Sequence, residues 1–275
     1  MSRKRRRPSA HSVATLAGVK LIRNHRRGFC NGNAARSAHM DCMTLTLPTI
    51  VASAFKLPDP IRAVIFDMDG TLLDTEAVHL NAFARTGAAI GWPMPQELLL
   101  SMVGIHRDGN RQMLADRLGP EFPLERFYAD SDALFEAAVD AGIPLRPGAD
   151  LLLDHLARRG IPMGLATSTA APFAQDRLEK TGIAQYFDVV VTRSDVMHPK
   201  PHPEPYLLAA ARLGLDPKDV VAVEDSYAGV QSATAAGIAT VLVPDLLPPT
   251  GELALACAAI LPSLADLRDL LVTTA

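Results

Sequence analysis

The sequence lacks the features of disulfide-stapled proteins and of membrane-spanning proteins. Its 275 residues include three cysteines, Cys30, Cys42 and Cys257, which are odd in number and show no zinc-site spacing. They argue against a disulfide framework and indicate a reducing compartment, so a cytoplasmic location is expected. The longest apolar stretch, near residues 253–265, is too short to cross a bilayer and contains Pro262. We therefore expect no membrane partner.

Acidic residues are missing from the first forty positions, which contain ten Lys or Arg and no Asp or Glu. Residues 41–275 contain 17 basic and 30 acidic residues, so this part is acidic and a poor candidate for binding nucleic acid. Residues 1–60 are predicted to be a disordered extension without a catalytic role. The alternatives are a nuclear or nucleic-acid-binding arm, an arginine-rich transit peptide, and a true chain start at Met43.

A short apolar stretch at residues 63–66 runs directly into two carboxylates. Four apolar residues, two of them β-branched, predict a strand that is buried on both faces. Asp67 and Asp69 are two positions apart on an extended chain and so point the same way, and Gly70 permits a sharp exit. A polar turn would explain either Asp alone. Two charges beside a buried strand cost too much without a cation or a reaction, so we predict a site for a hard cation and an anionic substrate.

The pattern after this strand predicts two kinds of architecture. Residues 75–145 read as helices broken at glycines and prolines, without strand alternation, whereas helices and short apolar strands alternate from residue 146 onward. The alternation predicts an α/β fold with a doubly wound parallel sheet. We expect a core domain of residues 61–74 and 146–275 and an inserted helical domain of residues 75–145. The later strands are expected at 162–166, 187–191, 220–223, 239–243 and 258–261.

Three further segments bring polar groups to the same edge of the predicted sheet. Thr167 follows the second strand, where its hydroxyl can hold a phosphoryl oxygen or cap the next helix. Lys200 lies among three prolines in a stiff connection that cannot be a helix or a central strand. The neighbouring His198 and His202 are interpreted as loop residues, not as metal ligands. Glu224 and Asp225 follow the fourth strand, and four carboxylates at one edge would repel one another without a cation.

Taken in order, these segments resemble the four motifs of the haloacid dehalogenase superfamily. Asp-Met-Asp-Gly-Thr at 67–71 is similar to the first motif, Thr167 to the second, Lys200 before Pro-x-Pro to the third and Glu-Asp-Ser at 224–226 to the fourth. The resemblance covers residues 61–275 and is greatest to members with a helical C1 cap. These include β-phosphoglucomutases, pseudouridine-5'-phosphatases and phosphoglycolate phosphatases. It implies a Rossmann-like core, a mobile cap and a Mg²⁺-dependent phosphatase that acts on a small-molecule phosphomonoester.

The resemblance also implies a role for each residue. Asp67 would attack phosphorus to form an aspartyl-phosphate, and Asp69 would act as general acid and then as general base. Thr167 and Lys200 would stabilise the phosphoryl oxygens in the transition state. The ligands of Mg²⁺ would be Asp67, Asp69 through its main-chain carbonyl, Glu224 and Asp225.

Substrate choice is expected to depend mainly on the cap. The predicted substrate-binding residues are His79, Gly104 and Arg107 in the cap and Ser168 in the core. Ordinary surface roles are the alternatives for His79 and Arg107, and helix capping is the alternative for Ser168. The alternative function is a β-phosphoglucomutase-like mutase, which must hold a second phosphate. Residues 72–145 contain no Lys, which favours hydrolysis. The protein is expected to be a monomer or a weak dimer.

Overall fold

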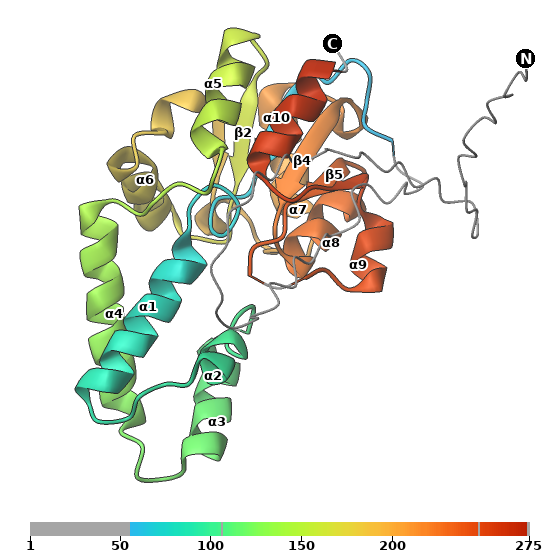
Figure 1. Cartoon of the computed structure of the whole chain (residues 1–275). Coiled ribbons are helices and arrows are strands. Elements are labelled where there is room, and N and C mark those ends of the chain that lie inside the picture. Colours follow the sequence, from blue (N-terminus) through green and yellow to red (C-terminus); the bar gives the residue numbers. More distant parts are fainter. Residues whose placement is uncertain (1–55, 106, 247, 274–275) are drawn as a thin grey trace, which may run out of the picture.

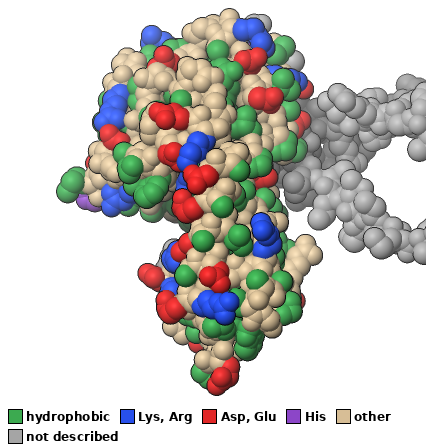
Figure 2. All heavy atoms as spheres, turned by 90° about the vertical axis from the view of Figure 1, so that its left-hand side faces the viewer, with side chains coloured by type: hydrophobic (Ala, Val, Ile, Leu, Met, Phe, Trp, Pro, Cys, Tyr) green, Lys and Arg blue, Asp and Glu red, His purple; other side chains and the backbone are tan. Residues whose placement is uncertain are grey.

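The computed structural model describes residues 56–105, 107–246 and 248–273, which form an α/β body and a helical cap (Figure 1). The predictions made for residues 1–55 lie outside this part of the chain. Figure 2 shows a waist between the larger body and the smaller cap, with acidic and basic side chains mixed over both. Within the described residues, no helix combines the length and the apolar character needed to cross a membrane.

The described part of the body contains a six-stranded sheet with all strands parallel. The strand order β3-β2-β1-β4-β5-β6 places β1 in the middle. The chain builds outward from β1 through β2 to β3, and then crosses to β4 on the other side. This reversal beside β1 is the position where ligands bind in open α/β sheets. The predicted fold class is confirmed. The strands are β1 (Ala63–Phe66), β2 (Met163–Ala166), β3 (Val189–Val191), β4 (Val220–Glu224), β5 (Ala239–Leu242) and β6 (Ala259–Ile260).

Helices cover both faces of the sheet, as the apolar character of the strands requires. Because alternate side chains of a strand point to opposite faces, Val64 and Phe66 join one hydrophobic cluster and Ala63 and Ile65 join another. The first cluster contains apolar residues of α5 (Ala149–Arg158), α6 (Ala171–Lys180) and α10 (Leu264–Thr273). The second contains apolar residues of α7 (Glu204–Leu213) and α8 (Tyr227–Ala235).

In its described residues, the cap has four helices between β1 and α5 and an apolar cluster of its own. Leu98, Met102, Leu114 and Phe127 are buried in this cluster. Phe135, farther along the last cap helix, belongs instead to the cluster that contains β1, so the two parts of the molecule share some core. The domain limits at residues 75 and 145 stay predictions. The cap helices are α1 (Thr75–Ala89), α2 (Gln96–Leu100), α3 (Arg107–Leu118) and α4 (Leu124–Ala141).

The two chain segments that join cap and body are bonded to each other. The amide of Asp74 donates to the carbonyl oxygen of Pro144 at 2.9 Å, and the amide of Arg146 donates to the carbonyl oxygen of Leu72 at 2.8 Å. The Arg146 side chain also forms an ion pair with Asp245, next to β5. The two connecting segments are therefore hydrogen-bonded to each other and anchored to the body, and they do not cross independently.

Two elements differ from the prediction for identifiable reasons. The third strand begins at residue 189 because the chain makes a short 3₁₀ turn at Ala184–Tyr186, and Phe187 leaves that turn to pack edge-on against Phe66. Helix α9 (Gly251–Ala256) was not predicted. It begins at Thr250, whose side chain accepts a hydrogen bond from the amide of Leu253. Six residues are too few to show a helical period.

Candidate active site

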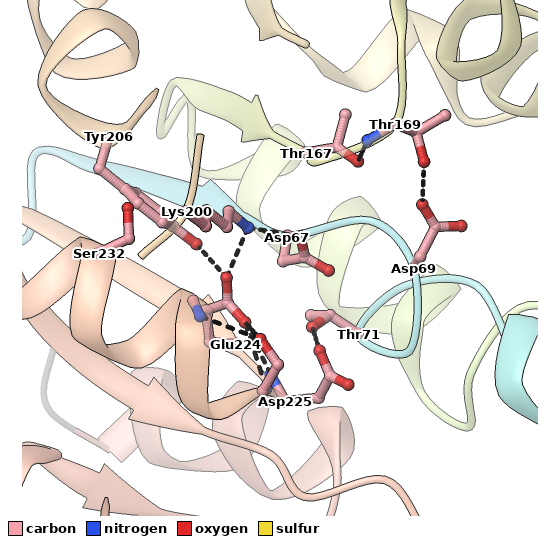
Figure 3. A network of polar contacts seen from close by, with 12 residues as sticks. Asp67, Asp69, Thr71, Thr167, Thr169, Lys200, Tyr206, Glu224, Asp225 and Ser232 are labelled. Atoms are coloured by element: carbon pink, nitrogen blue, oxygen red, sulfur yellow. Dashed lines mark hydrogen bonds and ion pairs between the residues drawn. The ribbon is translucent and has the colours of Figure 1, made fainter. Parts of the chain in front are cut away.

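The carboxyl ends of β1, β2 and β4 carry the predicted residues to one edge of the sheet (Figure 3). Strand-like pairing continues for one residue past β1 and β2, because the amide of Asp67 donates to Val223 and the amide of Thr167 donates to Val191, both at 2.9 Å. These backbone bonds fix the positions from which the two side chains project. Gly70, at φ +85°, then turns the chain away; a Cβ at this position would overlap the Asp225 carboxylate.

A buried ammonium group joins two of the carboxylates. The Nζ atom of Lys200 donates to Asp67 Oδ1 and to Glu224 Oε1, both at 2.6 Å. The side chains of these residues are 4%, 10% and 0% exposed, respectively. Burial raises the pKa of Asp67 to about 7, an effect that Lys200 opposes and Glu224 reinforces. Burial alone would lower the pKa of Lys200, but Asp67 and Glu224 raise it above its ordinary value, so the ammonium stays charged.

The partners of Glu224 indicate that it positions Lys200. Its Oε1 atom also accepts a hydrogen bond from the Tyr206 hydroxyl at 2.7 Å. Its Oε2 atom accepts from the Ser226 hydroxyl at 3.0 Å and from the amides of Asp225 and Ser226. Burial and the Glu224 charge raise the pKa of Tyr206 well above 10, which keeps it a donor. The assignment of Glu224 as a metal ligand stays a prediction, and holding Lys200 is a second role that the sequence did not reveal.

The carboxylate cluster fits a hard divalent cation. Asp67, Glu224 and Asp225 offer oxygen atoms that lie within 4.8 Å of one another. Burial, Asp67 and Glu224 raise the pKa of Asp225 well above its usual value, although the Thr71 hydroxyl donates to it at 2.9 Å. Both raised pKa values have the same physical cause: buried negative charges without enough positive charge nearby. An all-oxygen donor set with excess negative charge suits Mg²⁺ or a similar ion, so the residues present fit the predicted cofactor.

Asp69 has a separate set of partners. Its Oδ2 atom accepts a hydrogen bond from the Thr169 hydroxyl at 2.7 Å, and its Oδ1 atom accepts one from Arg177 Nη1, also at 2.7 Å. Figure 3 shows its carboxylate directed toward Thr169, apart from the group formed by Lys200 and Glu224. The two aspartates of the first motif therefore lie in different electrostatic surroundings, which two different catalytic roles require.

The turn after β2 also contributes to the site. The Thr167 hydroxyl accepts a hydrogen bond from the amide of Thr169 at 3.0 Å, and Thr167 is buried. Ser168 is exposed between them. Arg177 was not predicted because it lies two helical turns into α6, and only the docking of that helix brings it to Asp69. Tyr206, on α7, was missed for the same reason.

The cap residues differ in how closely they approach the core site. The His79 ring stacks on Phe135 with ring centroids 3.8 Å apart. The Arg177 guanidinium also lies over the Phe135 ring, with its Cζ atom 5.4 Å from the ring centroid. Burial and the Arg177 charge lower the pKa of His79 to about 4, so its imidazole is neutral at pH 7. His79 is thus linked to Asp69 through Phe135 and Arg177.

Arg107 is bound within the cap. Its guanidinium donates to both Asp132 oxygens, at 3.0 and 2.7 Å, and lies 4.6 Å from the Tyr128 ring centroid. Its side chain is 53% exposed. Gly104 forms an exposed turn just before it, at φ +73°. The substrate contacts of Arg107 and Gly104 stay predictions, because in this arrangement Asp132 holds the guanidinium.

Comparisons with known proteins agree with the motif assignment. Residues 61–237 match the family model of haloacid dehalogenase-like hydrolases. A phosphorylated carbohydrates phosphatase from Thermotoga maritima is 35% identical over 65% of this chain and 82% of its own length. A phosphoglycolate phosphatase from Yersinia pseudotuberculosis is 35% identical over 64% and 78%. A solved structure from Thermotoga maritima, described as a candidate beta-phosphoglucomutase, has a TM-score of 0.67 and 32% identity over 77% of this chain and 99% of that one. The chain therefore belongs to the haloacid dehalogenase-like hydrolases.

Proposed function

We propose that the protein is a Mg²⁺-dependent phosphatase that hydrolyses a small phosphomonoester, such as a sugar phosphate or a nucleoside phosphate, through a phosphorylated Asp67. The observation that carries this proposal is the contact between Lys200 and Asp67 beside a buried carboxylate cluster. A nucleophile, a fixed positive charge and ligands for a cation share one small volume. A phosphoryl group needs these three components, because its transfer depends on positioning and on charge stabilisation.

The first half of the reaction forms a covalent bond to the protein. A carboxylate oxygen of Asp67 attacks phosphorus, and the bond from phosphorus to the substrate's ester oxygen breaks. Asp69 donates a proton to that leaving oxygen, so an alcohol departs. Lys200 and Thr167 stabilise the charge on the phosphoryl oxygens. Bound Mg²⁺, held by Asp67, Asp225, Glu224 and the Asp69 carbonyl, would supply charge neutralisation between nucleophile and phosphate.

The second half regenerates the protein. Asp69, now ionised, accepts a proton from water, whose oxygen attacks phosphorus and breaks the bond to Asp67, releasing inorganic phosphate. Both Asp69 oxygens accept hydrogen bonds from Arg177 and Thr169 in the structure. A carboxylate has about four acceptor sites, so Arg177 and Thr169 can hold Asp69 while one of its oxygens contacts the leaving oxygen.

The names of two relatives, as well as the site, support the proposed substrate class. One relative is named for phosphorylated carbohydrates and another for phosphoglycolate, both small phosphorylated compounds. Purified protein should release phosphate from a panel of such compounds when Mg²⁺ is added, and EDTA should abolish the release. Asp67→Asn is the control for contaminating phosphatases. Equal phosphate release by Asp67→Asn and by the unaltered protein would overturn the proposal.

A mutase is the second candidate, because one similar structure is described as a candidate beta-phosphoglucomutase. A mutase must anchor a second phosphate, and residues 72–145 contain no Lys for that purpose. We expect phosphate release from hexose phosphates to be faster than conversion between the 1- and 6-phosphates of glucose. ³¹P NMR distinguishes the two reactions in one sample, and dominant interconversion would favour the mutase.

A further inference from the structure

A second group of metal-ligating side chains lies outside the carboxylate cluster. His198, His202 and Glu204 place three donor atoms within 4.8 Å of one another. Two imidazoles and one carboxylate suit borderline ions such as Zn²⁺ better than Mg²⁺, which prefers oxygen ligands alone. We propose that His198, His202 and Glu204 form a surface site for a divalent transition metal of the Zn²⁺ class, with water completing the coordination.

The distances match the size of such an ion. The Oε2 atom of Glu204 lies 2.9 Å from His198 Nδ1 and 3.9 Å from His202 Nδ1. Tetrahedral zinc, with bonds of about 2.0–2.1 Å, needs neighbouring donor atoms about 3.4 Å apart. The two observed distances lie on either side of this value. Shifts of about half an ångström would bring both distances to this value. His202 Nδ1 accepts a hydrogen bond from the amide of Glu204 at 3.2 Å, and it would exchange that bond for the ion.

The backbone already holds the ligands near one another. The amide of His202 donates to the Pro199 carbonyl oxygen at 2.9 Å, and the Ser232 hydroxyl donates to the His202 carbonyl oxygen at 2.6 Å. The Glu204 carboxylate accepts from the amides of Met197 and His198, at 2.8 and 2.9 Å. Prolines at 199, 201 and 203 restrict the same segment further. The entropy cost of assembling the site is therefore small.

The site is also accessible. The side chains of His198 and His202 are 66% and 49% exposed, and their ring centroids are 4.6 Å apart. A hydrated ion can therefore reach both rings from solvent. The same contacts have a structural alternative, in which Glu204 only closes the loop and His198 only donates to it. That alternative predicts no specific affinity for zinc, so metal binding distinguishes the two.

The site surrounds Lys200 in the chain, because His198 precedes it by two residues and His202 follows it by two. An ion at the proposed site would tie together the two ends of the segment that delivers Lys200 to Asp67. Because an ion that binds only the folded protein raises its stability, zinc should raise the melting temperature. This expectation provides a second measurement that is independent of catalysis.

The test uses the full chain in saturating Mg²⁺, which occupies oxygen sites, with Zn²⁺ as the titrated probe in a calorimeter. His198→Gln and His202→Gln should each lower the zinc affinity of the proposed site by about tenfold or more, since even loss of an outer-shell partner commonly costs that much. Both should also lose the zinc-dependent rise in melting temperature. His155→Gln and Asp225→Asn should leave the zinc affinity of the proposed site unchanged, because neither residue belongs to it.

The variants separate this site from the other histidines and cysteines of the chain. Co²⁺ bound in place of Zn²⁺ should give a visible absorption that His198→Gln abolishes and Asp225→Asn preserves. Circular dichroism checks that each variant is folded. Zinc affinity, stoichiometry and melting shift that are the same in the unaltered protein and in both His variants would overturn the proposal. Equal loss in His155→Gln would overturn it as well, because the effect would then not be specific to this cluster.

Discussion

At the scale of single residues, Asp67 and Asp69 show how two identical side chains two positions apart acquire different surroundings. Asp67 is buried against Lys200, and its pKa is raised to about 7. Asp69 is held by Arg177 and Thr169. The difference comes from the elements that pack around the loop, because the local sequence supplies only two carboxylates on one short turn.

Asp67→Asn should abolish turnover while leaving the fold intact. An amide cannot act as the nucleophile, so kcat should fall by roughly a thousandfold or more. Removing one buried negative charge also relieves repulsion with Glu224 and Asp225, so the melting temperature without divalent ions should not decrease. Hydrolysis of p-nitrophenyl phosphate and thermal unfolding in EDTA measure the two effects. Retained activity would show that Asp67 is not the nucleophile.

His79 should make the stability depend on pH in a predictable direction. Its pKa is about 4 in the folded protein, where burial and Arg177 lower it, against about 6.5 for an unfolded histidine. As the pH falls from 6.5 toward 4, the unfolded state takes up a proton that the folded state refuses, so stability is lost in that window. His79→Gln should therefore flatten this dependence. An NMR titration that shows a midpoint near 6.5 for His79 would contradict the prediction.

At the scale of helices and strands, much of the fold could be predicted because its signals are local. The apolar quartet at 63–66 is β1, and the segment from Glu204 to Leu213, bounded by Pro203 and Gly214, is α7. The meeting of Asp67 and Glu224 was also predictable, since parallel strands end at one edge, and the resemblance to the third motif assigned Lys200 to the same site. Arg177 and Tyr206 were not, because they project from helices whose rotation is fixed only by packing.

Gly229 should prove essential for a reason that helix propensity does not capture. Replacement of Gly by Ala in a helix is usually stabilising by up to about 1 kcal/mol. At Gly229, however, the added methyl group would overlap the buried carboxylate of Glu224, whereas at Gly251 it would meet nothing within 4 Å beyond its chain neighbours and its own helix backbone. Gly229→Ala should therefore cost about 2 kcal/mol of unfolding free energy and lower kcat, because Glu224 positions Lys200. Gly251→Ala is the matched control and should be neutral or slightly stabilising.

Urea unfolding and steady-state kinetics on the two glycine variants check this prediction. If Gly229→Ala were as stable and as active as Gly251→Ala, the tight contact with Glu224 would not matter for either property. Loss of activity without loss of stability would still agree with the positioning role of Glu224, because it would show that the carboxylate had moved and the helix had not.

At the scale of the whole molecule, the cap and the body meet through a few specific contacts beside the active site. Phe135 of the cap contacts both His79 and Arg177, and Lys180 of α6 forms a 2.7 Å ion pair with Asp140 of α4. The paired segments near residues 72–74 and 144–146 form the covalent connection. The exposed Lys180–Asp140 pair contributes little to stability, so rotation of the cap would be opposed mainly by the core that Phe135 shares with the body. Closure over Asp67 would exclude water during the first step.

Closure makes a specific prediction for Arg107. Its guanidinium uses two of its five N–H donors on Asp132 in the structure, so a substrate in the closed cap would bind the donors that remain or replace Asp132. Arg107→Ala should lower kcat/KM by about tenfold for the preferred substrate and much less for p-nitrophenyl phosphate, which needs little from the cap. Arg126→Ala is the matched control, because Arg126 is an exposed cap residue paired with Asp130. Equal losses on both substrates would show that Arg107 supports the core chemistry or the fold, and no loss on either would show that its pairing with Asp132 is only a surface contact.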